Sequence, residues 1–171
     1  ITEIPQYAFY NCSSLTSLNL GDNITTIGEK AFSYCQALAS LNVGQNILTV
    51  GLGAFDLCSS LTSLDLGNDV ISIGGFAFYY CDKLASLNIG KNITSIPDGV
   101  FQGCGALKAL DFGNNVTSIG ESAFAYCVSL ASLNLGNKVT SIGKTAFAGC
   151  WNLESLTFGD NVEFVGKMAF D

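Results

Sequence analysis

The sequence contains no histidine and no arginine, and only 12% of its 171 residues are charged, against about 25% in an ordinary globular protein. Histidine is the most common general base and metal ligand. Its absence excludes Ser-His-Asp and Cys-His catalysis and the usual histidine-containing zinc sites. No nucleophile–base pair, phosphate-binding loop or metal-ligand cluster is apparent. We therefore expect a non-catalytic protein that uses no metal or other cofactor.

Positive charge is also scarce. The seven basic residues, all of them lysines, stand against 14 carboxylates, which gives a net charge of −7. Nucleic-acid binding requires lysine and arginine to neutralise phosphates, so the composition argues against a nucleic-acid partner. The sequence also lacks a run of about 18 apolar residues of the kind that spans a membrane, and we expect no direct membrane insertion.

What the sequence does contain is a repeat of 23 residues. Seven cysteines recur at this spacing: Cys12, Cys35, Cys58, Cys81, Cys104, Cys127 and Cys150. A phenylalanine recurs with them in eight copies: Phe9, Phe32, Phe55, Phe78, Phe101, Phe124, Phe147 and Phe170. Seven full units span residues 1–161 and a partial eighth unit spans 162–171. Because no linker separates the units, we expect a single solenoid domain over 1–171. No capping unit is evident.

The pattern within one unit predicts its local structure. Leu18 and Leu20 alternate with Ser17 and Asn19, as in a strand with one buried face. A second short extended segment is expected at 24–27, and the spacing of apolar residues over 29–35 predicts one or two helical turns. A unit this short buries its apolar side only against its neighbours. The predicted fold is therefore an α/β repeat solenoid with a parallel β-sheet, short second strands and short helical turns.

These motifs resemble a known repeat family. The units read LxxLxLGxN followed by [IV]-T-S-I-G-x-x-A-F-x-x-C, which is similar to the BspA-like, or Treponema-type, leucine-rich repeat. The resemblance implies a right-handed leucine-rich-repeat array that is non-catalytic, extracellular or at the cell surface, and active in adhesion and protein binding. The family commonly has proline after the strand, whereas this chain has glycine there in all seven units: Gly21, Gly44, Gly67, Gly90, Gly113, Gly136 and Gly159.

The recurrent phenylalanines and cysteines are predicted to be structural. Each cysteine follows an Ala/Val-Phe pair by three residues, which places it on the same inward face. We interpret the cysteines as reduced, small hydrophobic core residues. Neighbouring units could bring two cysteines within disulfide distance, but parallel side chains need not meet the dihedral requirement. The phenylalanines are expected to form a continuous buried spine.

The best candidates for a binding surface are Tyr34, Tyr80 and Tyr126, which share one column of the repeat beside the cysteines. One interpretation is that they pack over the seams between units. The other is that they form a partly exposed apolar stripe, which is typical of a partner-binding site. The exposed sheet face has small side chains that are polar except at Ala109, which favours a solvated surface, with contact to a glycan or a partner sheet as the alternative.

Four sequons of the form N-x-S/T predict N-linked glycosylation if the chain passes through a eukaryotic secretory route. They begin at Asn11, Asn23, Asn92 and Asn115. The last three share a column with Asp69 and Lys138. Because an unpaired lysine is rarely buried, this column is expected to be exposed. Asn11 is a weaker candidate because it precedes a cysteine of the core column.

Two functional hypotheses follow. In the first, the chain is an adhesive binding module whose partner is a protein or glycan at a surface. In the second, it is a structural subunit whose partners are further copies of itself. Its uncapped ends would then build an extracellular, glycosylated filament, with the Tyr34/Tyr80/Tyr126 stripe supplying lateral contacts.

Overall fold

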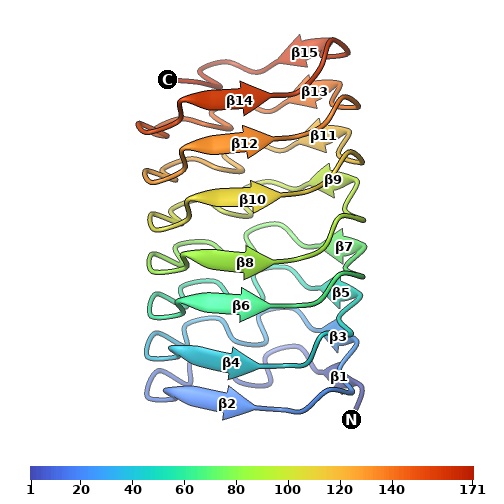
Figure 1. Ribbon diagram of the computed structural model, residues 1–171. Helices are drawn as coiled ribbons and strands as arrows, with labels where there is room; N and C mark the ends of the chain where they lie inside the picture. The colour runs from blue at the N-terminus through green and yellow to red at the C-terminus, as the bar shows by residue number, and fades with distance from the viewer.

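The computed structural model describes residues 1–171 and contains 15 short strands and no helix. Each unit of 23 residues forms one coil of a right-handed solenoid, and the two termini lie at opposite ends of the stack (Figure 1). The repeat predicted from the sequence is thus one physical layer of the molecule.

The longer strands form one face of the stack (Figure 1). Every strand pairs in parallel and in register with its equivalent, so that Leu18 lies opposite Leu41 and Leu110 opposite Leu133. Hydrogen bonding joins them into three groups, β2-β4, β6-β8 and β10-β12-β14. The seven strands are β2 (Ser17–Asn19), β4 (Ser40–Asn42), β6 (Ser63–Asp65), β8 (Ser86–Asn88), β10 (Ala109–Asp111), β12 (Ser132–Asn134) and β14 (Ser155–Thr157).

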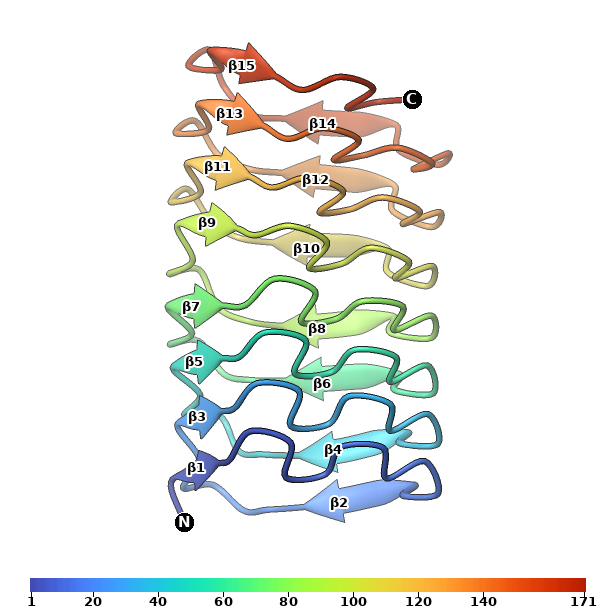
Figure 2. The same ribbon diagram turned by 180° about the vertical axis from the view of Figure 1, so that it is seen from behind.

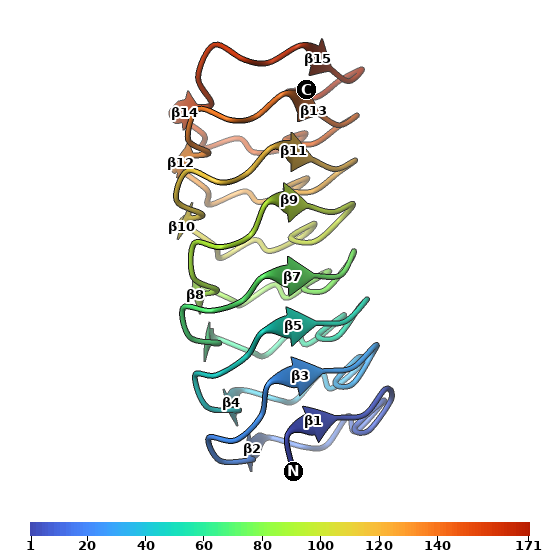
Figure 3. The same ribbon diagram turned by 90° about the vertical axis from the view of Figure 1, so that its right-hand side faces the viewer.

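The second strands are only two residues long and lie beside the first set (Figure 3). They form two parallel sheets, β1-β3-β5-β7 and β9-β11-β13-β15. The eight strands are β1 (Glu3–Ile4), β3 (Thr26–Ile27), β5 (Thr49–Val50), β7 (Ser72–Ile73), β9 (Ser95–Ile96), β11 (Ser118–Ile119), β13 (Ser141–Ile142) and β15 (Phe164–Val165).

The interruption between β7 and β9 coincides with Pro97. At the equivalent position of the neighbouring units, the Gly74 N–H donates to the Val50 carbonyl at 2.8 Å and the Gly120 N–H to the Ile96 carbonyl at 2.7 Å. Proline has no N–H to donate. One hydrogen bond between units is therefore lost where the sheet is broken.

The expectation of short helical turns is wrong, and with it the α/β class: the chain is a parallel β-solenoid. The segments in question are successive tight turns that cross the rear of the stack (Figure 2). Their N–H groups alternate between two kinds of acceptor. The Phe32 N–H donates to the Ala54 carbonyl of the next unit at 2.8 Å, whereas the Ser33 N–H donates to the Lys30 carbonyl three residues back at 3.2 Å. Beyond its first turn, an α-helix bonds each N–H to the carbonyl four residues back in its own segment. Here alternate N–H groups bond to the next unit instead, and the others bond three residues back.

Left-handed backbone conformations occur twice in most of these segments. Lys30 has φ of 49° and Tyr34 has φ of 63°, at the third position of turns closed by the N–H groups of Ala31 and Cys35 respectively. Such turns are type II, which requires positive φ at that position and favours glycine there. Glycine does occupy four equivalent positions: Gly53, Gly99, Gly103 and Gly149. A residue in this conformation ends any right-handed helix.

The core is a stack of phenylalanine rings that runs through the solenoid. Phe32, Phe55, Phe78, Phe101 and Phe124 are fully buried. Along the column from Phe9 to Phe170, the centroids of successive rings are separated by 5.1–5.7 Å. The rings are parallel to within a few degrees except between Phe101 and Phe124, where the angle is 21°. The rings thus hold each coil in register with the next.

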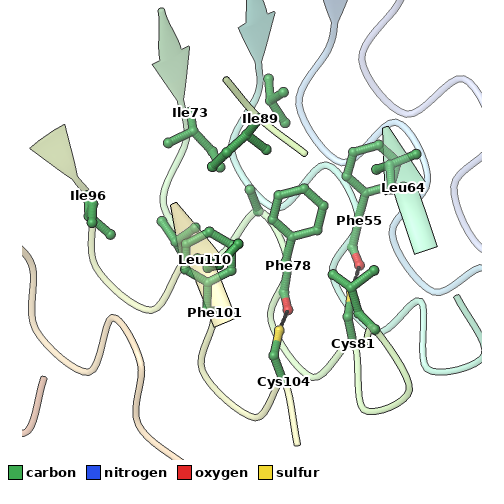
Figure 4. Packing of buried hydrophobic residues seen from close by; sticks show 14 of the residues in the cluster. Phe55, Leu64, Ile73, Phe78, Cys81, Ile89, Ile96, Phe101, Cys104 and Leu110 are labelled. Atoms are coloured by element: carbon green, nitrogen blue, oxygen red, sulfur yellow. Dashed lines mark hydrogen bonds between the residues drawn. The ribbon is translucent and has the colours of Figure 1, made fainter. Parts of the chain in front are cut away.

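The cysteines form a second ladder beside the rings. From Cys35 onward, each thiol donates a hydrogen bond of 3.0–3.1 Å to the phenylalanine carbonyl 26 residues earlier. Figure 4 shows this contact between Cys104 and Phe78. All seven cysteines are free, and Cys12 alone is exposed. Burial raises the pKa of Cys35 and of Cys150 to about 11 and raises that of the cysteines between them further.

Candidate functional site

The polar side chains on the long strands hold the turns that follow. Asn19 Oδ1 accepts a hydrogen bond from the Gly21 N–H at 3.0 Å, and Asp65 Oδ1 accepts one from Gly67 at 2.9 Å. The same bond recurs at Asn42, Asn88, Asp111 and Asn134. The Asn and Asp oxygens of this column therefore already accept hydrogen bonds from the solenoid's own backbone, which leaves them less available to bind a ligand.

The same turns explain why glycine follows the strand. Gly67 has φ of 84°, and a Cβ there would lie 1.9 Å from the Gln45 carbonyl oxygen of the preceding unit. Neither an L side chain nor the fixed φ of proline fits this geometry. The glycines thus permit the close approach of adjacent coils.

The tyrosine column lies on the opposite, turn-bearing side. The exposed fraction of the side chain is 39% for Tyr34 and 50% for Tyr126, and Tyr80 is half-buried. The ring of Tyr80 covers Gly103, where an added Cβ would lie 2.7 Å from Tyr80 Cδ1. Tyr126 covers Gly149 in the same way. Each of these two rings therefore packs over the seam to the next unit while part of the side chain stays exposed.

The three tyrosines do not form one continuous cluster. Tyr34 belongs to a group in which its ring centroid lies 5.8 Å from that of Tyr10, which in turn lies 5.6 Å from Tyr7. Within the same column, Leu57 separates Tyr34 from Tyr80 and Gly103 separates Tyr80 from Tyr126.

A second aromatic group surrounds Tyr80. Its ring centroid lies 4.6 Å from that of Tyr79, and Tyr79 lies 5.7 Å from Phe76. Phe76 was not predicted from the sequence as a binding residue. It lies four residues before Tyr80, and the two left-handed positions of the turn segment place both side chains on one surface. We call this surface the aromatic face, formed by Tyr7, Tyr10, Tyr34, Phe76, Tyr79, Tyr80 and Tyr126.

The aromatic face is hollowed near its C-terminal end. A depression of about 440 Å³ lies beside Tyr126 and is bordered by Trp151, Met168 and Asp171. The Trp151 side chain is 80% exposed. Tryptophan and tyrosine are among the residues enriched in the energetic centres of protein interfaces, so this end of the face has the composition of a contact surface.

The sequons lie in two columns of the repeat, with Asn11 in the tyrosine column and Asn23, Asn92 and Asn115 in the turns that follow the long strands. Asn11, Asn23 and Asn92 are exposed, and Asn115 is half-buried. The Asn92 amide nitrogen donates to the Asn68 carbonyl at 3.2 Å, and the Asn115 amide nitrogen donates to the Lys91 carbonyl at 3.1 Å. A primary amide has two N–H donors, so each of these bonds leaves one N–H free.

A cluster of metal ligands or a membrane-spanning helix would indicate a particular kind of site. No group of three or more Cys, Asp or Glu side chains is placed to hold a metal ion. The structure also contains no helix of the length and apolar character needed to cross a membrane.

Similar solved structures share this architecture. A leucine-rich repeat protein of Treponema pallidum is 27% identical with a TM-score of 0.81, and the match covers 90% of this chain and 72% of that one. A leucine-rich cell surface protein of Faecalibacterium prausnitzii is also 27% identical, with a TM-score of 0.69 and coverage of 94% and 52%. A leucine-rich repeat protein of Eubacterium ventriosum, at 23% identity and a TM-score of 0.77, shares the fold over 92% of this chain and 42% of its own.

The sequence itself carries the repeat signature along its whole length. No curated protein sequence matches the chain. The model of the BspA type leucine rich repeat region matches residues 2–130 and 49–171 in six copies. The chain belongs to the BspA-type leucine-rich repeat family.

Proposed function

We propose that this chain is a non-catalytic binding module, outside the cell or at its surface, that recognises a partner protein through the aromatic face. The observation that carries this proposal is the occupation of left-handed turn positions by partly exposed aromatic residues. Tyr80 has φ of 49° and Tyr126 has φ of 60°, which a non-glycine residue adopts at a cost in free energy. Gly103 and Gly149 in the same column show that the fold does not need a side chain there.

The family and its relatives support this location and role. The Faecalibacterium prausnitzii relative is described as a cell surface protein, and leucine-rich solenoids present extended surfaces suited to binding. Because the front sheet uses its Asn and Asp side chains to hold turns, the aromatic face is the better candidate for contact.

Binding to a panel of immobilised extracellular proteins, measured by surface plasmon resonance, tests the proposal. The variant replaces three tyrosines together: Tyr34→Asn, Tyr80→Asn and Tyr126→Asn. Asparagine suits the column, since Asn11 occupies it with φ of 57°. We expect the variant to weaken binding at least about tenfold, equivalent to about 1.4 kcal/mol.

A matched control triple on the front sheet carries Ser40→Ala, Ser63→Ala and Ser86→Ala. It should bind as the unmodified protein does. Loss of binding in the serine triple, with the tyrosine triple unaffected, would assign recognition to the front sheet instead.

Self-assembly into a filament is the competing proposal, because the same exposed aromatic residues could contact further copies of the chain. Light scattering coupled to size-exclusion chromatography at several concentrations separates the two. A mass that rises with concentration and falls back in the tyrosine triple supports assembly, whereas a constant monomer mass supports binding to a different protein.

A further inference from the structure

A hollow of about 320 Å³ lies beside the second aromatic group, next to Phe76 and Tyr79. Its lining residues are Lys30, Leu52, Gly53, Asp56, Phe76 and Tyr79. Gly53 lies between Lys30 and Phe76 in one column of the repeat, and it contributes no side chain. A Cβ at Gly53 would lie 3.4 Å from Lys30 Cγ and 3.7 Å from Asp56 Cβ. The glycine therefore leaves a space that its neighbours do not fill.

Asp56 at this hollow has an unsatisfied oxygen. Its Oδ2 accepts a hydrogen bond from Ser33 Oγ at 3.3 Å. Its Oδ1 is buried and has no hydrogen-bond partner, and it is the one buried side-chain nitrogen or oxygen in the structure of which this is true. Buried polar atoms are almost always hydrogen-bonded, and an exception calls for an explanation.

The neighbouring side chains of the chain do not compensate for the burial of the Asp56 carboxyl group. Lys30 is the lysine at the hollow, but the two ion pairs of the protein join Lys91 to Asp111 and Lys144 to Glu121. Burial raises the pKa of the Asp56 carboxyl, and the opposing effects of the Ser33 hydrogen bond and the Lys30 charge are smaller. The carboxylate thus has an acceptor oxygen that no group of the chain uses, and a positively charged donor would offset the cost of its burial.

The walls of the hollow are suited to such a donor. The rings of Phe76 and Tyr79 meet at 78° with centroids 5.7 Å apart, and aromatic faces attract cations. Leu52, which is 45% exposed, and the stem of Lys30 add apolar surface. The net charge of −7 favours the approach of a basic partner.

We propose that this hollow receives the lysine or arginine side chain of a partner protein. The aliphatic stem packs against Leu52 and Phe76, and the cationic group donates to the Asp56 carboxylate. The inference rests on the proposed function, because it specifies what the aromatic face recognises in its partner.

The test uses two small probes and the intact, isotope-labelled protein. Nuclear magnetic resonance titration compares N-acetyl-lysine methylamide with N-acetyl-norleucine methylamide, which has a similar stem but no ammonium group. We expect the lysine probe to shift the backbone resonances of Gly53 and Phe76 and to bind at least about tenfold more tightly than the norleucine probe, equivalent to about 1.4 kcal/mol.

Two variants examine the assigned roles. Asp56→Asn should abolish the preference for the lysine probe, whereas Asp160→Asn, which removes an exposed carboxylate elsewhere, should retain it. Lys30→Met removes the competing resident charge and should strengthen binding of the lysine probe but not of the norleucine probe. Methionine suits this column, since Met168 occupies it with φ of 57°.

Equal binding of the two probes, or absence of shifts at Gly53 and Phe76, would overturn the cation site. These outcomes leave the proposed function standing, because the tyrosine triple tests that proposal without the small probes. Conversely, a selective response to the lysine probe would support the cation site even if none of the immobilised proteins bound.

Discussion

The Cys81 thiol donates a hydrogen bond to the Phe55 carbonyl oxygen, 3.1 Å away and 26 residues earlier in the chain. The same oxygen accepts the N–H of Cys58 at 3.1 Å, so both of its lone pairs are used. The bond joins one coil to the previous one in a part of the core where both residues are fully buried. The cysteine is therefore a small core residue that also satisfies a backbone acceptor.

This arrangement predicts that the protein loses stability at alkaline pH. Burial raises the pKa of the folded-state thiols above the ordinary value of 9.0, to about 11 for Cys35 and Cys150. Thiols in the unfolded chain release their protons first, so stability is fully present below about pH 9 and is lost as pH rises toward the folded-state values. The slope is about 1.4 kcal/mol per pH unit for each such thiol.

Urea denaturation in reducing buffer between pH 8 and about pH 10.5 measures this dependence. Cys81→Ala should be less stable at neutral pH but should show a shallower decline, by the share of one thiol. Curves of the variant and the unmodified protein that run parallel over this range would contradict the account.

The phenylalanine spine predicts that alanine substitutions at two nearby phenylalanines differ strongly in their effect on the free energy of unfolding. Phe78 is fully buried between Phe55 and Phe101, whereas Phe76 is 43% exposed. Phe78→Ala should lower the free energy of unfolding by about 3–5 kcal/mol. Phe76→Ala should lower it much less, because its ring lies on the surface. Equal losses in thermal or urea denaturation would show that the two faces are misassigned.

Replacement of two nearby glycines by alanine should have contrasting effects on stability. Gly103 has φ of 78° and an added Cβ would lie 2.7 Å from the Tyr80 ring, so Gly103→Ala should destabilise the protein by at least about 1 kcal/mol. Gly105 is not in the left-handed region, and its Cβ would meet its nearest neighbours at 3.7 and 3.8 Å. Gly105→Ala should be neutral or stabilising by about 0.4–1 kcal/mol. Melting temperatures of both variants check this, and the reverse order would refute it.

Glycosylation is predicted at Asn23, Asn92 and Asn115, and less so at Asn11, when the chain is made in a eukaryotic secretory host. The first two are exposed, and the bonded amides of Asn92 and Asn115 each retain a free N–H. Intact mass before and after glycosidase treatment reports occupancy. Replacement of each asparagine by glutamine assigns the sites, and a mass unchanged by the glycosidase would disprove the prediction.

Much of the fold could be predicted from the sequence because the repeat imposes its own geometry. A constant spacing of 23 residues places Leu18 over Leu41 and Phe32 over Phe55, and identical residues at equivalent positions fix the register. The alternation around Leu18 likewise identifies the buried face of the strand. The predicted Tyr34, Tyr80 and Tyr126 column lies on the turn-bearing side, but which of these residues contact one another depended on the neighbours that adjacent coils bring in.

The helical turns were mispredicted because the spacing of inward residues over 29–35 fits both a helix and a series of turns. Glycine at Gly53 and Gly103, in columns that also hold lysine and tyrosine, was the available sign of left-handed backbone. A segment this short also gains little from hydrogen bonds within itself. Bonds to the adjacent coil decided its conformation.

The sequence by itself determined the repeat length, the inward and outward faces and the family, because these depend on which residue types recur at one period. Only the tertiary structure decided where the hydrogen bonds of the turns go, which carbonyl each thiol satisfies and which oxygen of Asp56 lacks a donor. Those features arise between residues about one coil apart, and the stacking of the coils sets their distances.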